Sequence, residues 1–138
     1  MISSLLEAAF VATTYRVEAN GIFFALRIGK CSPEFDDLLA EAGVEEWTIV
    51  TAHNPGGFQS SKENRLCEAR FDAYLDSSKL HFYEVGHVAD DGKWPEERGR
   101  LVLGLNEVEA CRLGRTCRQT AVVCGNRGGV PRLVWLGV

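Results

Sequence analysis

The stretch TIVTAHNPGGFQSSKEN, residues 48–64, combines residue types that could bind an anion. Its apolar first part is typical of a strand and its last part of the start of a helix. The turn between them consists of Asn54, Pro55, Gly56 and Gly57. A helix start directs free backbone N–H groups and the positive end of its dipole at such a turn. The turn lacks the lysine and the length of a P-loop and is not GxGxxG. A plain turn, whose proline and glycines only set backbone angles, is the alternative.

The helix predicted over residues 61–76 places an asparagine on an otherwise apolar face. At 100° per residue that face contains Asn64, Cys67, Phe71, Tyr74 and Leu75. A buried asparagine without hydrogen-bond partners costs about 1–3 kcal/mol. Asn64 therefore either ties down the backbone of the 54–60 loop or contacts a ligand in the same pocket.

Three further polar residues are candidates for this pocket. Glu63 and Arg70 flank the apolar face on one side, and Arg70 is a better candidate than Arg65, which points to the opposite side. A solvated surface charge is the alternative for either arginine. Gln119 precedes an apolar strand at a helix-to-strand joint, where it either fixes the turn or reaches the edge of the pocket.

The segment GHVADDGKWPEERG, residues 86–99, is longer than a strand connection requires. It contains His87, Trp94, Glu96 and Glu97. Paired carboxylates can act as general acid and base or bind hard metals. Adjacent residues of a strand point to opposite faces, so the two glutamates are not expected to share one site. A solvated acidic loop with Trp94 folded onto the core is the alternative.

The remaining reactive residues predict no metal, no cofactor and no identifiable catalytic residue. The three histidines lack paired metal-ligand spacing, and no G-x-S-x-G motif is present. A Cys67–His53 nucleophilic pair is conceivable, but Cys67 lies on the apolar face, where burial would raise its thiol pKa.

Local signals predict the elements that must position these residues. Asn20-Gly21 predicts a hairpin, Ser32-Pro33 a helix start, and the pairs Ser60/Glu63 and Asn106/Glu109 two capping boxes. The predicted helices cover residues 2–10, 33–42, 61–76 and 106–117, and the predicted strands cover 13–18, 22–28, 47–53, 80–88, 99–105, 120–124 and 131–136. We therefore expect one compact α+β domain over residues 1–138, with a mixed, mostly antiparallel sheet and about four helices packed on it.

The composition excludes several classes of protein. The chain has 138 residues, of which 46% are hydrophobic and 25% charged, as in ordinary globular domains. Its net charge of −4 argues against non-specific nucleic-acid binding. No apolar run approaches the roughly 20 residues that span a bilayer, and the N-terminal segment does not have the pattern of a signal peptide. The five cysteines are an odd number without a CxxC pair, so we expect a reducing, cytoplasmic compartment.

Several motifs together resemble the bacterial domain-of-unknown-function family 3293. They are TAHNPGG followed by S and EN, then DGKWPEE, LVLGL, QTAVV and LVWL. The family typically has glycine where this chain has Arg118. The resemblance implies a small stand-alone bacterial cytoplasmic domain with no established activity. Its characteristic polar positions correspond here to Asn54, Glu63, Asn64, Trp94, Glu96 and Gln119.

Two functions follow as hypotheses. The first is binding of a small polar or anionic ligand, of the nucleotide or sugar-phosphate class, at the strand–Asn-Pro-Gly-Gly–helix junction. The second is a protein-interaction or regulatory module, including a homodimer, which docks through the terminal strand 131–136 with Trp135 and Trp94 as anchors.

Overall fold

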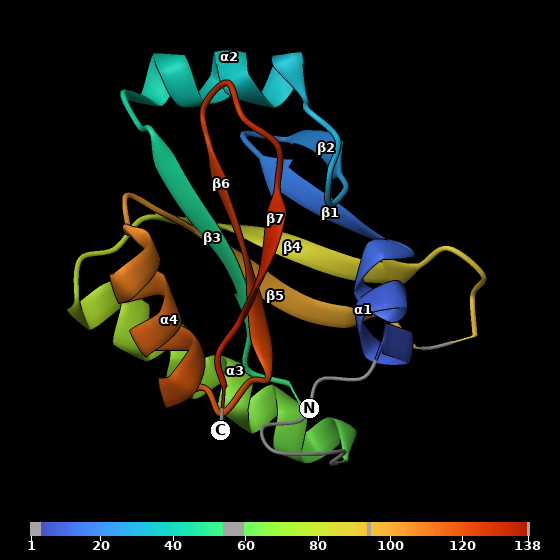
Figure 1. Cartoon of the computed structure of the whole chain (residues 1–138). Helices are drawn as coiled ribbons and strands as arrows, with labels where there is room; N and C mark the ends of the chain where they lie inside the picture. Colours follow the sequence, from blue (N-terminus) through green and yellow to red (C-terminus); the bar gives the residue numbers. More distant parts are fainter. Residues whose placement is uncertain (1–3, 54–59, 94, 138) are drawn as a thin grey trace.

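The computed structural model describes residues 4–53, 60–93 and 95–137 (Figure 1). The elements in chain order are α1 (Ser4–Val11), β1 (Thr13–Ala19), β2 (Ile22–Leu26), α2 (Pro33–Ala42), β3 (Glu46–Thr51), α3 (Ser61–Ser77), β4 (Phe82–Ala89), β5 (Glu97–Leu103), α4 (Glu107–Thr116), β6 (Ala121–Asn126) and β7 (Arg132–Trp135). The α+β class and the predicted order of helices and strands are confirmed.

The seven strands form one sheet in the order β2-β1-β4-β5-β3-β6-β7. Each of its strand pairings is antiparallel, so the parallel component expected of a mixed sheet is not found among the described residues. The physical reason is that no helical connection joins neighbouring strands. The connection through α2, for example, leads from the edge strand β2 to β3, which pairs with β5 and β6.

The predicted Asn20-Gly21 hairpin and the three predicted helix starts are confirmed. Asn20 and Gly21 have φ angles of 54° and 79°, as a two-residue type I′ hairpin requires. Ser32 caps α2, and complete capping boxes begin α3 and α4. These caps satisfy the first N–H groups of each helix and so set where the helices begin.

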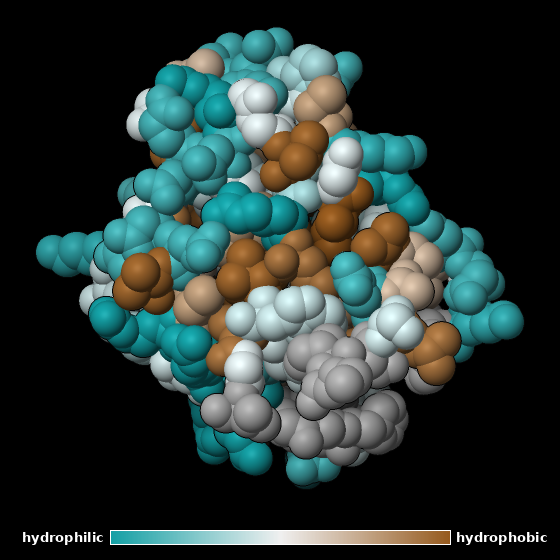
Figure 2. All heavy atoms as spheres, in the orientation of Figure 1, coloured by the Kyte–Doolittle hydropathy of each residue, from teal (hydrophilic) through white to brown (hydrophobic). Residues whose placement is uncertain are grey.

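The two faces of the sheet carry separate cores. On one face α2 packs Phe35 and Leu39 against a cluster that includes Trp47 and Ile49, and its outer side is hydrophilic (Figure 2). On the other face Phe71 and Leu75 of α3 and Leu113 of α4 pack in a cluster with Val50, Val102 and Val122. No helix in the described part of the chain is long and apolar enough to cross a membrane.

Part of the face beneath α3 remains open. Cross-strand register aligns Arg16 of β1 with Gly86 of β4, and Gly86 with Arg98 of β5. Arg16, Glu18, Phe23 and Glu84 are exposed on this side. We call the α3-side face of β2, β1 and β4 the open strip, because polar residues there meet solvent instead of a helix.

A network of charges and a hollow beneath α3

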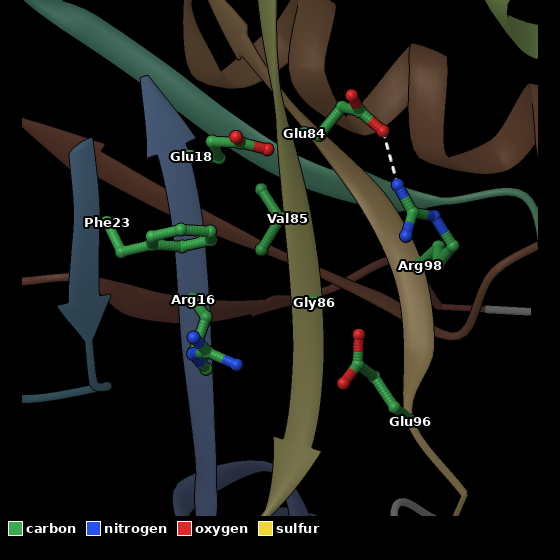
Figure 3. Close-up of a pocket in the computed structure, with 8 residues that line it drawn as sticks. All are labelled: Arg16, Glu18, Phe23, Glu84, Val85, Gly86, Glu96 and Arg98. Atoms are coloured by element: carbon green, nitrogen blue, oxygen red, sulfur yellow. Dashed lines mark hydrogen bonds and ion pairs between the residues drawn. The ribbon is translucent and has the colours of Figure 1, made fainter. Parts of the chain in front are cut away.

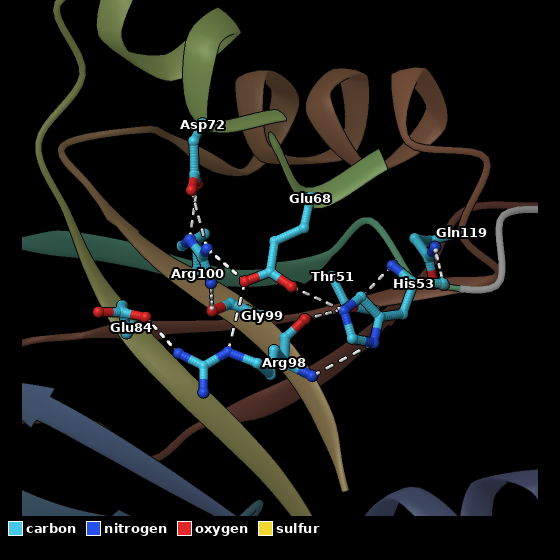
Figure 4. Close-up of polar contacts among 9 residues, drawn as sticks. All are labelled: Thr51, His53, Glu68, Asp72, Glu84, Arg98, Gly99, Arg100 and Gln119. Carbon is cyan, nitrogen blue, oxygen red and sulfur yellow. Dashed lines mark hydrogen bonds and ion pairs between the residues drawn. The ribbon is translucent and has the colours of Figure 1, made fainter. Parts of the chain in front are cut away.

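Five residues form a polar cluster where α3 crosses the sheet: His53, Glu68, Asp72, Arg98 and Arg100 (Figure 4). We call them the Glu68 network. Glu68 and Asp72 are four residues apart on α3 and therefore share one face of that helix. Arg98 and Arg100 are two apart on β5 and share the face of the sheet that α3 covers.

Arg100 is the buried cation of the network, with a side chain only 4% exposed. Its Nε and Nη2 donate to the Asp72 carboxylate at 2.7 and 2.9 Å, and Nη2 also donates to Glu68 Oε1 at 2.7 Å. Its Nη1 donates to the Gly99 carbonyl at 2.9 Å. Burial alone would lower the pKa of Arg100, but the hydrogen bonds that it donates to Asp72 and Glu68 raise it overall. The guanidinium is thus held charged in a fixed orientation.

Glu68 connects the buried part of the network to its exposed part. Its carboxylate lies 3.0 Å from His53 Nε2 and accepts from Arg98 Nε at 3.3 Å, besides the bond from Arg100. Burial would raise the pKa of Glu68, but the hydrogen bonds with His53 and Arg100 lower it below the ordinary value. Glu68 is therefore an anion that fixes three other side chains.

Backbone contacts hold the end of β3 beside the network. The His53 amide donates to Thr51 Oγ1 at 3.0 Å, and that hydroxyl donates to the Arg98 carbonyl at 2.8 Å. Gln119 Nε2 donates to the His53 carbonyl at 3.0 Å. The same Nε2 also donates to the Cys117 carbonyl at 3.2 Å, so Gln119 links the joint between α4 and β6 to the end of β3.

The hollow is a shallow depression of about 70 Å³ in the open strip (Figure 3). Its lining consists of Arg16, Glu18, Phe23, Glu84, Val85, Gly86, Glu96 and Arg98. Arg98 forms one side of the hollow. Its guanidinium is held in place by ion pairs with Glu84 and with Glu68. The Arg16 guanidinium lies over the Phe23 ring, 5.0 Å from its centroid.

The floor of the hollow depends on a glycine. A Cβ at Gly86 would lie 2.7 Å from Glu96 Oε2, so glycine lets the Glu96 carboxylate lie over the strand where any larger residue would displace it. Neither Glu18 nor Glu96 forms an ion pair within the described residues. Both carboxylates remain available to a bound group.

His87 lies on the opposite face of the sheet. Its ring packs edge-on against Tyr15, with centroids 5.0 Å apart, and also lies against Gly99. Its Nε2 is buried and has no hydrogen-bond partner among the described residues. Burial, together with the nearby His53, lowers the pKa of His87 from 6.5 to about 4. This histidine is therefore neutral in the folded protein near pH 7.

The structure places the predicted site residues in different environments. Asn54, Gly56, Gly57 and Trp94 lie outside the described residues. Glu63 caps α3 by accepting from the Ser60 amide and hydroxyl at 3.2 and 2.9 Å. Asn64 is half-buried in the first turn of α3, whereas Arg70 is exposed and is not part of the network. Glu96 lines the hollow, and Gln119 reaches His53.

Sequence reasoning missed the Glu68 network. The sequence pattern assigned Tyr74 to the inward face of α3, but Tyr74 is 48% exposed. The face of α3 that meets the sheet instead includes Glu68 and Asp72, which bind Arg100. A usable signal was present in the pattern of β5. An arginine in the apolar run RLVL must be buried, and a buried arginine requires carboxylates such as a pair spaced i, i+4 on a helix.

Comparison with protein-family models matches residues 50–122 to the family described as "Protein of unknown function (DUF3293)". The chain belongs to this family. The matched DUF3293 segment contains the whole Glu68 network together with Glu84, Glu96 and Gln119, but not Arg16 or β2. No curated protein and no solved structure matches the chain.

The turn after α4 places an arginine in a backbone conformation that favours glycine. Arg118 has a φ of 56°, in the left-handed region. The turn after α4 closes in the usual way, with the Gln119 amide donating to the Gly114 carbonyl at 3.0 Å. The chain therefore keeps a glycine-type turn and forces an arginine into it.

Proposed function

We propose that this DUF3293 protein binds a small polar ligand at the hollow of the open strip. The observation that carries the proposal is the contrast between its charged groups. Arg98 is fixed by Glu68 and Glu84, whereas the carboxylates of Glu18 and Glu96 have no ion-pair partner in the described chain. A guanidinium held in place by ion pairs, next to carboxylates without ion-pair partners, is typical of a ligand-binding site.

The charges of the lining favour a ligand group that donates hydrogen bonds. Two arginines and three glutamates leave the ionised lining with a net charge of −1. An amine or a guanidinium can donate hydrogen bonds to the carboxylate of Glu18 or of Glu96. A phosphate would face three carboxylates there, so the predicted nucleotide or sugar-phosphate class is less suited to this hollow.

The size of the hollow limits what it encloses. Its volume of about 70 Å³ is well below the roughly 300–1,000 Å³ of sites that enclose a drug-sized ligand. We expect it to hold one head group, with the remainder of the ligand lying across the open strip.

The proposal is for binding and assigns no reaction. His53 is the described residue best suited to transfer a proton, but both ring nitrogens are engaged. Nε2 lies 3.0 Å from Glu68, and Nδ1 faces the Arg98 amide at 3.5 Å. A ligand in the hollow therefore finds no free base in the network.

A thermal-shift screen tests the proposal. The probes are agmatine, arginine and ethanolamine as cationic head groups, with inorganic phosphate and AMP as anionic ones. A probe at 100 times its Kd stabilises a protein by about 2.7 kcal/mol, which moves the melting temperature by several degrees. We expect a cationic probe to raise the melting temperature of the wild type and of Glu34→Gln, an exposed control on α2, but not of Glu96→Gln.

Two results would contradict the proposal. One is an equal shift in Glu96→Gln and Glu34→Gln, because the ligand would then bind elsewhere. The other is a shift with phosphate or AMP alone, which would favour an anion site. Gly86→Ala provides a second test, because its Cβ displaces the Glu96 carboxylate and should abolish the shift without touching a charge.

A further inference from the structure

The lining of the hollow includes an arginine whose charge no carboxylate compensates. Arg98 binds the carboxylates of Glu68 and Glu84. Arg16, by contrast, is exposed and forms no ion pair with any described residue. Its guanidinium lies over the face of the Phe23 ring, a contact that is weak at an exposed site. Arg16 is therefore the cation of the lining that remains able to bind an anion.

Arg16 and the Glu96 carboxylate lie on either side of the same glycine. Arg16 of β1 is aligned with Gly86 of β4, and such cross-strand neighbours have Cβ positions about 4.5–5.5 Å apart. Glu96 Oε2 reaches to 2.7 Å from the position that a Cβ of Gly86 would occupy. Figure 3 shows the two side chains on opposite sides of β4, with Gly86 between them. Two opposite charges thus lie across a space that glycine leaves open, without forming an ion pair.

We propose that the head group bound in the hollow is a zwitterion, with its carboxylate on Arg16 and its ammonium on Glu96, which rests on the proposed function and narrows its ligand class to free amino acids. A free amino acid carries both charges close together, so it can contact two protein groups of opposite charge that do not reach each other. Both contacts are charge-assisted hydrogen bonds.

A ligand with a single charge matches these groups less well. An amine on Glu96 brings a second cation near Arg16 and leaves that guanidinium uncompensated. A carboxylate without an ammonium binds Arg16 but faces the carboxylates of Glu18 and Glu96. A zwitterion compensates Arg16 and Glu96 together and adds no net charge to the hollow.

Glu18 favours an amino acid with a basic side chain. It is two residues from Arg16 on β1, so the two side chains share the face of the sheet that carries the hollow. With Glu96 bound to the ammonium of the ligand, Glu18 is the remaining carboxylate of the lining without an ion pair in the described chain. Arginine is accordingly the most informative probe.

NMR titrations of the whole chain test the two charges of the head group separately. The probes are arginine, agmatine, which lacks the carboxylate, and N-acetylarginine, which lacks the ammonium charge. Arginine should bind about fivefold more tightly than either analogue, since ion pairs at exposed groups are weak.

A variant of Arg16 assigns the carboxylate contact. Arg16→Gln should weaken the binding of arginine to the level of agmatine and should not weaken the binding of agmatine. Because Arg16 is exposed, we expect the variant to keep the fold, which its NMR spectrum also reports. Arg65→Gln, which replaces an exposed arginine of α3 outside the hollow, is the matched control and should keep the fivefold preference.

The outcomes separate this proposal from binding at the hollow as such. Equal affinities of the wild type for arginine and agmatine would overturn the zwitterion and leave a cationic ligand in place. N-acetylarginine binding as tightly as arginine would overturn it too, as would a preference for arginine over agmatine that survives in Arg16→Gln. Failure of all three probes to bind, together with a flat thermal-shift screen, would overturn the proposed function and the zwitterion with it.

Discussion

Glu68 and Glu84 both bind Arg98, but replacing Glu68 should lower the free energy of unfolding far more than replacing Glu84. Glu68→Ala leaves Arg100, which is 4% exposed, with Asp72 as its remaining carboxylate, and removes the partner of His53 Nε2. Breaking a buried ion pair costs about 3–5 kcal/mol. Because Asp72 still compensates Arg100 and is itself one-third exposed, we expect a loss of about 3 kcal/mol in the free energy of unfolding.

Glu84→Ala is the matched control. Glu84 pairs with the same Arg98, but both side chains are 50% exposed, so the pair should contribute less than about 1 kcal/mol. The assay is urea denaturation at pH 7 followed by circular dichroism, with the two variants compared at the same denaturant slope.

A double variant separates the charge effect from lost packing. Arg100→Met in the Glu68→Ala background removes a buried charge that has lost one of its two carboxylates and should restore part of the lost stability. The reasoning is refuted if Glu68→Ala and Glu84→Ala cost the same, or if Arg100→Met adds its full single-variant cost in the double variant.

Two further predictions concern His87 and Arg118. Burial lowers the pKa of His87 to about 4, so its contribution to stability is complete above pH 6.5 and is lost as the pH falls from 6.5 toward 4, by up to about 3 kcal/mol. His87→Phe should flatten this part of the stability–pH curve measured by urea denaturation. An unchanged slope would contradict the assignment. Arg118→Gly should stabilise the protein by about 0.5–1 kcal/mol in thermal melts, because glycine adopts the positive φ without strain. Arg112→Gly within α4 should instead destabilise it by about 1 kcal/mol in the same assay.

Local signals in the sequence predicted the elements well because their causes are local. Asn20-Gly21 is a hairpin turn since both residues tolerate positive φ, and Ser60 with Glu63 begins α3 since their hydrogen bonds span only three residues. The same applies to the order of helices and strands.

The candidate site was predictable only in part. Glu96 and Gln119 were selected from the sequence, and they lie at the hollow and beside His53. Arg100 was not selected, because its burial depends on the pairing of β5 with β3 and on α3 crossing that pair. The traces of these contacts in the sequence are the apolar run around Arg100 and the i, i+4 spacing of Glu68 and Asp72, and neither shows which segments meet.

The sequence by itself determined where the capped helices α2, α3 and α4 begin and where the first hairpin turns, because caps and hairpins involve residues a few positions apart. The tertiary structure alone decided the strand order, the rotation of α3 toward Glu68 and Asp72, and the open strip with its hollow. It also decided that β2, and not only the terminal strand β7, is an edge. The physical reason is that these features arise from contacts between segments tens of residues apart, where burial and charge pairing are settled only when the whole sheet has formed.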